Sequence, residues 1–199
     1  KAYCERGVIL VSVEYRCNLF GFLAHPWLTA ENELHISGNY GILDQIAALK
    51  WVYENIEAFG GDREQITVFG QSAGAMSVQT LVSSRLTEHM IAGAVMQSGG
   101  SYGGGLHRDM KLAELESYGE IFADIIHADS LVELRSKTAE EIMAAAGEFM
   151  EKVLPQAGGL FLVPVIDGYV LDCGYYEAVD QGKIRDIPYI LGSTKNDIL

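Results

Sequence analysis

Apolar residues along the chain form two kinds of pattern: short continuous runs, and longer stretches in which they recur every three or four positions. Continuous β-branched runs of this length predict buried strands. The predicted strands are residues 7–15, 65–69, 91–98 and 187–193. The three-and-four spacing predicts helices over residues 42–56, 73–82 and 112–126. Strands that alternate with helices predict the α/β fold class, with a mostly parallel sheet and helices on both of its faces.

Local signals predict further elements in the second half of the chain. Capping boxes that begin at Ser130 and Thr138 predict two helix starts, and the second helix is expected to run to about Lys152. The dipeptide Asp167-Gly168 between apolar runs predicts a β-hairpin. No internal repeat interrupts these elements, and a length of 199 residues favours a single domain.

The strand predicted at residues 65–69 ends at a sharp corner that contains a serine. The spacing Gly70-x-Ser72-x-Gly74, between a strand and a helix of small residues, is that of a nucleophile elbow. In this motif the serine takes a strained conformation with positive φ, and glycines two positions away leave room for the bend. The N–H of Ala73 then lies at a helix N-terminus and can stabilise an oxyanion. The alternative is a turn serine that caps the helix, but the flanking strand and helix favour the nucleophile.

A serine nucleophile needs a base, which is normally a histidine oriented by a buried carboxylate. In the fold that contains this motif, the serine comes first along the chain, then the acid, then the histidine. Asp197 follows the last predicted strand and is the candidate acid, the alternative being an exposed loop aspartate. No histidine follows it. The five histidines, which all precede it, are His25, His35, His89, His107 and His127. Each is better explained as a surface or core histidine than as the base, and His107, beside a glycine loop, is the least unsuitable candidate. The glycines at 103–105 follow the nucleophile, so we interpret them as a loop and not as an oxyanion hole.

Composition limits the classes of partner. A formal net charge of -13 opposes binding to nucleic acid or to an anionic membrane. No apolar run reaches the roughly 20 residues of a membrane-spanning helix. Three cysteines without a CxxC motif predict neither a disulfide framework nor a zinc site, and we expect buried free thiols. The cysteines do not determine the cellular compartment, although the cytoplasm is slightly favoured. The sequence does not determine the oligomeric state either.

Several long stretches, in order, resemble one family. They are "VSVEYRCNLFGFL", "GNYGILDQIAALKWVYENIEAFGGDREQITVFGQSAGAMSV", "AVMQSGG", "PVIDGYVL" and "ILGSTKNDIL". Together they resemble the type-B carboxylesterases, the cholinesterase-like branch of the α/β-hydrolases, through nearly the whole chain. The resemblance implies that residues 1–199 are the central part of a single α/β-hydrolase domain, incomplete at both ends.

The resemblance also implies roles for individual residues. Ser72 matches the nucleophile of a carboxylic ester hydrolase that works through an acyl-enzyme, and Ala73 matches an oxyanion donor. Asp197 matches the triad acid, and Ser98 in "QSGG" matches a serine that helps to hold this acid. A buried serine bonded only to backbone is the alternative for Ser98. The implied substrate is a small ester, and no cofactor or metal is implied.

The chain departs from the family pattern in three ways. Gln71 stands where the family often has glutamate, which removes one negative charge beside the site. Asp197 stands where the acid is usually glutamate. The family's HGG oxyanion loop would lie before Lys1 and its histidine after Leu199, so we expect the 199 residues alone to be nearly inactive. Two rival functions stay open: a non-catalytic interaction domain, and another serine hydrolase such as a peptidase or thioesterase.

Overall fold

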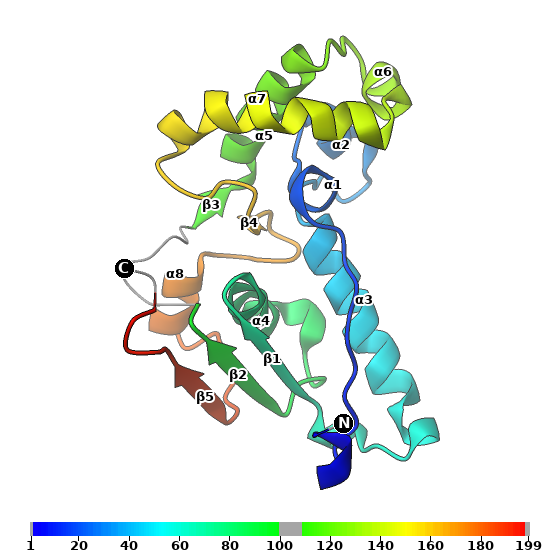
Figure 1. Ribbon diagram of the computed structural model, residues 1–199, viewed down its shortest axis with the longest axis vertical. Helices are drawn as coiled ribbons and strands as arrows, with labels where there is room; N and C mark the ends of the chain where they lie inside the picture. Colours follow the sequence, from blue (N-terminus) through cyan, green and yellow to red (C-terminus); the bar gives the residue numbers. More distant parts are fainter. Residues whose placement is uncertain (1, 100–108, 198–199) are drawn as a thin grey trace.

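The structure is a computed structural model that describes residues 2–99 and 109–197. Its elements form two parts, a sheet with helices packed against it and a mainly helical part beside the sheet (Figure 1). The candidate base His107 and the glycines at 103–105 lie outside the described residues.

Three parallel strands form the main sheet, in the order β1–β2–β5. Their bounds are β1 (Thr67–Gln71), β2 (Gly93–Gln97) and β5 (Tyr189–Gly192). The register aligns Gln71 with Gln97 and Gln97 with Gly192, so all three strands end on one line. The three arrows in Figure 1 accordingly point the same way. Parallel sheets place their chemistry at this carboxyl edge, which makes it the place to look for a site.

Three helices accompany the sheet on one face. They are α3 (Tyr40–Asn55), α4 (Ala73–Ser83) and α8 (Tyr175–Asp180). The helix α4 packs directly on β1 and β2, and α3 and α8 pack against α4. Ile42, Ala75 and Met96 are among the buried residues that join these layers. Phe69 and Ile190 on the opposite face are 47% and 67% exposed, so the described helices cover one face of this sheet.

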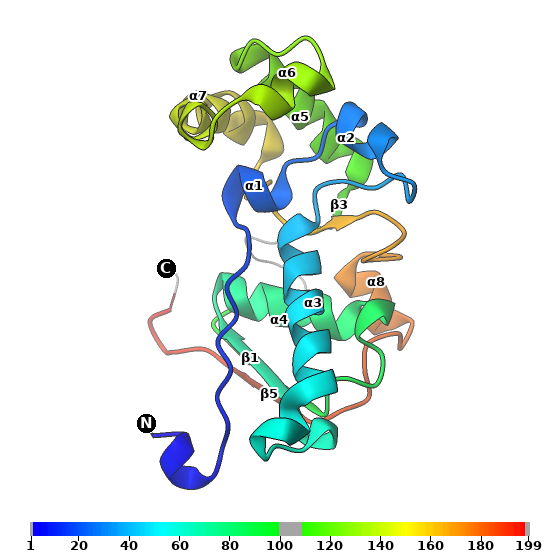
Figure 2. The same ribbon diagram turned by 90° about the vertical axis from the view of Figure 1, so that its right-hand side faces the viewer.

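The helical part has a core of its own. Its elements are α1 (Asn18–Phe22), α2 (Pro26–Glu31), β3 (Met110–Lys111), α5 (Leu112–Ile125), α6 (Leu131–Ser136), α7 (Ala139–Ala157) and β4 (Val165–Ile166). Phe149 lies at its centre and meets Phe122 and Phe161 edge-on, at 5.2 and 5.4 Å between ring centroids. The predicted capping box at Thr138 is complete and starts α7, which continues past Lys152. Figure 1 shows α7 lying across this part, and Figure 2 views the same helix nearly along its axis.

Short 3-10 turns connect several of these elements. They are η1 (Cys4–Arg6), η2 (Ile56–Phe59), η3 (Arg63–Gln65) and η4 (Arg85–Thr87). The predicted helices at residues 42–56, 73–82 and 112–126 are confirmed within a few residues as α3, α4 and α5. Three predicted strands are likewise confirmed as β1, β2 and β5.

The prediction of a buried strand at residues 7–15 is wrong. This segment is irregular chain between η1 and α1, and Val8 and Val11 are 48% and 42% exposed (Figure 2). A β-branched run becomes a strand only where a neighbour takes up its backbone hydrogen bonds. None of the described strands pairs with it, so its local preference is not realised.

The predicted hairpin around Asp167 is also wrong. Val165 and Ile166 pair in parallel with β3, far away in sequence. The Asp167 carboxylate accepts hydrogen bonds from the N–H groups of Tyr169 and Val170, at 2.9 and 2.8 Å. The side chain thus takes up the donors that a hairpin ladder would need, and the chain turns without forming a second strand.

The prediction of buried thiols is wrong for two of the three cysteines. Cys4 and Cys17 are exposed, and Cys173 is half-buried. All three are free thiols, as predicted. None of the helices in the described ranges is long and apolar enough to cross a membrane.

Candidate active site

Ser72 stands at the corner between β1 and α4, as the motif predicts. Its φ of 54° and ψ of -120° lie in a region that non-glycine residues avoid, at a cost of about 1–3 kcal/mol. The strain is held by backbone hydrogen bonds: Ser72 N–H donates to the Gln97 carbonyl at 2.9 Å, and its carbonyl accepts from Ala75 N–H at 2.9 Å. The side chain makes no cap hydrogen bond to α4. Ser72 is exposed, and its hydroxyl forms no hydrogen bond with any of the described residues, which argues against a helix-capping serine.

The two glycines of the motif differ in what they do. A Cβ on Gly70 would collide with the backbone carbonyl group of Gly74, so strand and helix approach too closely there for any side chain. A Cβ on Gly74 would meet none of the described residues within 4 Å. The expectation that both positions need glycine for the bend is therefore correct for Gly70 and wrong for Gly74.

A third glycine, which the sequence analysis did not identify, supports the elbow from β2. A Cβ on Gly99 would lie 2.5 Å from the Ser72 carbonyl oxygen and 3.1 Å from the Ala75 methyl group. Ser98 just before it also has positive φ, 53°, and its N–H donates to the Gly192 carbonyl at 2.8 Å. The sequence gives no signal for this contact, because Gly99 and Ser72 are neighbours only across the sheet.

The start of α4 provides the donor that an oxyanion needs. Ala73 is the first residue of α4, and N–H groups of the first turn have no carbonyl partner within their own helix. The helix dipole adds positive potential at the same end. Ala73 is exposed beside Ser72, so its N–H is available to a bound molecule.

Asp197 lies in the loop that leaves β5 at the same edge as Ser72. The register of β2 with β5, and the bond from Ser98 N–H to Gly192, fix the start of this loop beside the elbow. The Asp197 carboxylate accepts a hydrogen bond from Thr194 N–H at 3.1 Å. Within the described residues it forms no hydrogen bond with Ser98. The end of β5 lies at the predicted edge, whereas the approach of Asp197 to Ser72 and its contact with Ser98 stay predictions.

None of the histidines in the described ranges forms a hydrogen bond with Ser72. His25 is 2% exposed in the helical part, where its Nδ1 accepts from Trp27 N–H at 3.0 Å. Burial lowers the pKa of this imidazole, and the nearby Glu120 and Glu116 partly oppose the effect. The side chain of His89 is 84% exposed beside Glu88. The described residues thus contain the candidate nucleophile and the candidate acid of a triad, and no described histidine is placed as its base.

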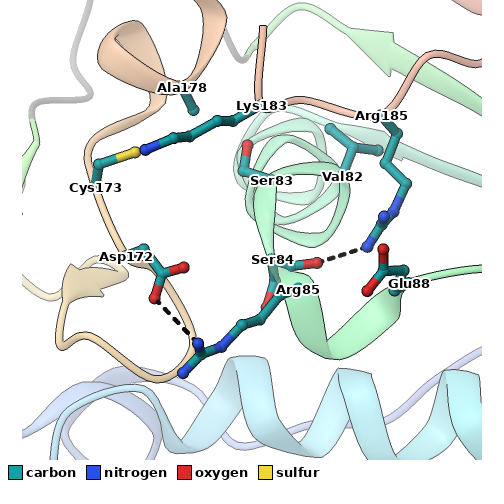
Figure 3. A pocket seen from close by; sticks show the side chains of 10 residues that line it. All are labelled: Val82, Ser83, Ser84, Arg85, Glu88, Asp172, Cys173, Ala178, Lys183 and Arg185. Atoms are coloured by element: carbon teal, nitrogen blue, oxygen red, sulfur yellow. Dashed lines mark hydrogen bonds and ion pairs between the residues drawn. The ribbon is translucent and has the colours of Figure 1, made fainter. Parts of the chain in front are cut away.

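A cavity of about 220 Å³ lies at the opposite end of α4 (Figure 3). The 11 residues of α4 separate it from Ser72 by about 16 Å, at 1.5 Å per residue. Arg185 donates to the Ser84 carbonyl at 2.8 Å and thereby satisfies the end of the helix. Arg85 pairs with Asp172 across the cavity at 3.9 Å. These contacts hold the fold together, and the cavity is not part of the elbow.

The described ranges contain no group of three or more histidine, cysteine or acidic residues placed to hold a metal ion. A strained serine between a parallel strand and a helix, with the third strand ending alongside, defines this edge as that of an α/β-hydrolase. The profile of the carboxylesterase family matches residues 2–199. The chain belongs to the carboxylesterase family.

Individual relatives agree with this assignment. Fumonisin B1 esterase of Sphingopyxis macrogoltabida is 38% identical over 98% of the chain, and para-nitrobenzyl esterase of Bacillus subtilis (strain 168) is 36% identical over 99%. The crystal structure of the carboxylesterase Est55 from Geobacillus stearothermophilus superposes with a TM-score of 0.80, at 38% identity over 98% of the chain. The chain spans 35%, 39% and 39% of the lengths of these three proteins.

Proposed function

We propose that the polypeptide containing these residues hydrolyses small carboxylic esters, with Ser72 as the nucleophile. The observation that carries the proposal is the backbone of Ser72, whose φ of 54° places its hydroxyl at the N-terminus of α4 without a cap hydrogen bond to that helix. A strain of this kind persists where the surrounding structure enforces it and is concentrated at functional sites. Membership of the carboxylesterase family supports the same reaction.

In this mechanism Ser72 Oγ attacks the ester carbonyl carbon while a base removes its proton. The negative charge that develops on the carbonyl oxygen is stabilised by the Ala73 N–H and the positive end of α4. The alcohol leaves with a proton from the base, which produces an acyl-enzyme. Water then attacks with help from the same base and releases the carboxylic acid.

Asp197 is proposed as the carboxylate that orients the base, and Ser98 as a residue that positions Asp197. Ser98 follows β2 and Asp197 follows β5, and in the register of the sheet both strands end at the same edge as Ser72. Gly70 supports the reaction indirectly, because it allows β1 and α4 to meet closely enough to form the bend. We further propose that residues 1–199 are part of one α/β-hydrolase domain.

The test uses the full open reading frame that encodes this chain, with a fluorophosphonate probe and ethyl hexanoate. Ser72→Ala should abolish labelling and lower kcat by about 10⁶, the loss measured when a triad serine is removed. The control is Ser117→Ala, the same change at an exposed position on α5, which should leave both readouts unchanged. Full labelling of the Ser72→Ala variant would overturn the proposal, because another serine would then be the reactive one. A wild type that is neither labelled nor active would favour the non-catalytic interaction domain.

A further inference from the structure

A second strained serine follows the strand next to the elbow. Ser72 comes directly after β1 and Ser98 directly after β2, and their φ angles are 54° and 53°. Positive φ is uncommon for residues other than glycine, because the Cβ atom crowds the backbone. The two strands pair in register up to Gln71 and Gln97, so the two strained turns leave the sheet at the same level.

The residues on either side of Ser98 hold the two peptide groups of Ser72. On one side, the Gln97 carbonyl accepts a hydrogen bond from Ser72 N–H at 2.9 Å. On the other side, the backbone of Gly99 lies so close that an added Cβ would be 2.5 Å from the Ser72 carbonyl oxygen. Because Ser98 alone separates these two contacts along the chain, its backbone conformation decides whether both can form together. Residues 97–99 thus act as a clamp on Ser72.

The clamp is itself fixed to the third strand. Ser98 N–H donates to the carbonyl of Gly192, the last residue of β5, at 2.8 Å. The chain that leaves β5 at this point leads to the candidate acid Asp197. Two backbone hydrogen bonds, from Ser98 to Gly192 and from Ser72 to Gln97, therefore connect the start of the acid loop to the nucleophile. Both bonds lie within the sheet, so they do not depend on which parts of the protein cover its faces.

We propose that Ser98 is a positioning residue for Ser72 and acts through its own positive-φ turn. The proposal rests on the proposed ester hydrolysis, and it is separate from the contact of the Ser98 hydroxyl with the acid. A nucleophile that is misplaced by about 1 Å can lose on the order of 100-fold in rate. A small change in the turn at Ser98 should therefore reduce turnover before the fold is lost. Glycine takes positive φ freely, whereas a β-branched residue resists it strongly.

The experiment separates the backbone of Ser98 from its hydroxyl by comparing Ser98→Gly, Ser98→Ala and Ser98→Val in the full open reading frame. All three variants lack the hydroxyl, so its loss affects them equally. With ethyl hexanoate, the glycine variant should have a kcat at least equal to that of the alanine variant. The valine variant should have a kcat about 10- to 100-fold below the alanine variant. KM should stay within about threefold, because the turn positions the nucleophile and does not bind the ester.

The matched control makes the same change at another residue with positive φ. His89 has a φ of 65°, its side chain is 84% exposed, and it follows the end of α4 that is far from Ser72. His89→Val strains the backbone in the same way and should lower stability relative to His89→Ala, while the two variants keep the same kcat. A loss of kcat that is confined to the Ser98 series therefore reports positioning and not general destabilisation.

Two further measurements keep the test decisive if Ser98→Val folds poorly. Ser98→Thr retains the hydroxyl and adds one branch, so its kcat should still fall about tenfold below that of the wild type. Deuterium exchange at the Ser72 amide should be faster in Ser98→Thr than in the wild type, because its hydrogen bond to Gln97 is weakened. This readout does not require turnover.

The proposal is overturned if the glycine, alanine and valine variants share one kcat, or if His89→Val loses as much kcat as Ser98→Val. Hydrolysis of ethyl hexanoate that depends on Ser72 would in that case still support the proposed function. Absence of any such hydrolysis by the wild type defeats the proposed function, and the positioning role with it.

Discussion

The backbone of Gly99 lies directly against the carbonyl of Ser72. A Cβ added to Gly99 would come within 2.5 Å of the Ser72 carbonyl oxygen. The same carbonyl accepts hydrogen bonds from Ala75 and Met76, so it cannot move without breaking the first turn of α4. The strained serine is thus held between its own helix and the end of the neighbouring strand.

Gly99→Ala should therefore disturb the elbow from the end of the neighbouring strand. We expect the free energy of unfolding to fall by about 1–3 kcal/mol, the range for overpacking in a tight site. Labelling of Ser72 by a fluorophosphonate should decrease in the full-length protein. A methyl group that displaces the Ser72 carbonyl also displaces the hydroxyl of the same residue. Urea unfolding and labelling rates measure the two effects, and an unchanged value for both would show that the contact is not restrictive.

Gly70→Ala and Gly74→Ala should behave differently, although both positions belong to the motif. Gly70→Ala forces a methyl group into the backbone of Gly74 and should unfold or displace the corner. Gly74→Ala places its methyl in open space within the described residues, at the second position of α4. Alanine is favoured over glycine in helices by up to about 1 kcal/mol, so stability should hold or rise. Parallel thermal melts of the two variants compare them, and equal destabilisation would contradict this account.

The sequence predicted those parts of the site that depend on local geometry. The positive φ of Ser72 follows from glycine spacing between a strand and a helix, and these are interactions among near neighbours. The place of the end of β5 at the same edge as Ser72 follows from the parallel sheet that alternating strands and helices predict. Gly99 was missed because its requirement comes from Ser72, which is distant in sequence but adjacent in the sheet. A single sequence contains no signal for that contact.

The two wrong predictions in the fold have the same origin. The apolar run at residues 7–15 has strong strand preference, but a strand requires a partner, and none of the described strands provides one. Asp167-Gly168 is a common hairpin turn, but the Asp167 carboxylate takes the N–H groups itself and β4 pairs with β3 instead. In both cases tertiary pairing decided the structure.

His25 should make the stability of the chain depend on pH near neutrality. Burial lowers the pKa of this imidazole below its ordinary value of 6.5, so the folded state favours the neutral form. The unfolded chain binds the proton more readily, hence this contribution to stability is present above about pH 6.5 and is lost as pH falls towards the folded pKa. Urea unfolding at pH 7.5, 6.5 and 5.5 should show the loss.

The variant His25→Gln should flatten that profile between pH 7.5 and 5.5, whatever its own stability. The control is His89→Gln, at a side chain that is 84% exposed, and it should keep the wild-type pH dependence. A slope that persists in His25→Gln would assign the effect to another group.

Arg16 should anchor the segment before α1 through a forked contact with α3. Its Nε and an Nη donate to the two Asp44 carboxylate oxygens at 2.8 and 2.7 Å, and its backbone N–H donates to the same carboxylate at 2.9 Å. Arg16→Lys removes the fork but keeps the charge. Since the Arg16 side chain is 52% exposed, the loss should be only about 1 kcal/mol in the free energy of unfolding.

Asp44→Asn should cost as much as Arg16→Lys or more, because it also weakens the bond from the backbone. Arg16 holds the pKa of the Asp44 carboxyl below its usual value of 3.8. The stabilisation is therefore present above about pH 4 and is lost as pH falls further. Denaturation curves at pH 7 and pH 3 check this, since the difference between wild type and Asp44→Asn should shrink at the lower pH.

The last prediction concerns the activity of the 199-residue chain on its own. It should hydrolyse ethyl hexanoate hardly faster than its Ser72→Ala variant, because no described histidine bonds Ser72 and a serine hydroxyl without a base keeps its proton. Loss of a triad serine or histidine costs about 10⁶ in kcat, although oxyanion donors such as Ala73 N–H leave a small residue of activity. The measurement is the rate of the purified chain against that of Ser72→Ala under the same conditions. A rate thousands of times above the variant would mean that these 199 residues contain a base, and His107→Gln would then be the first substitution to make.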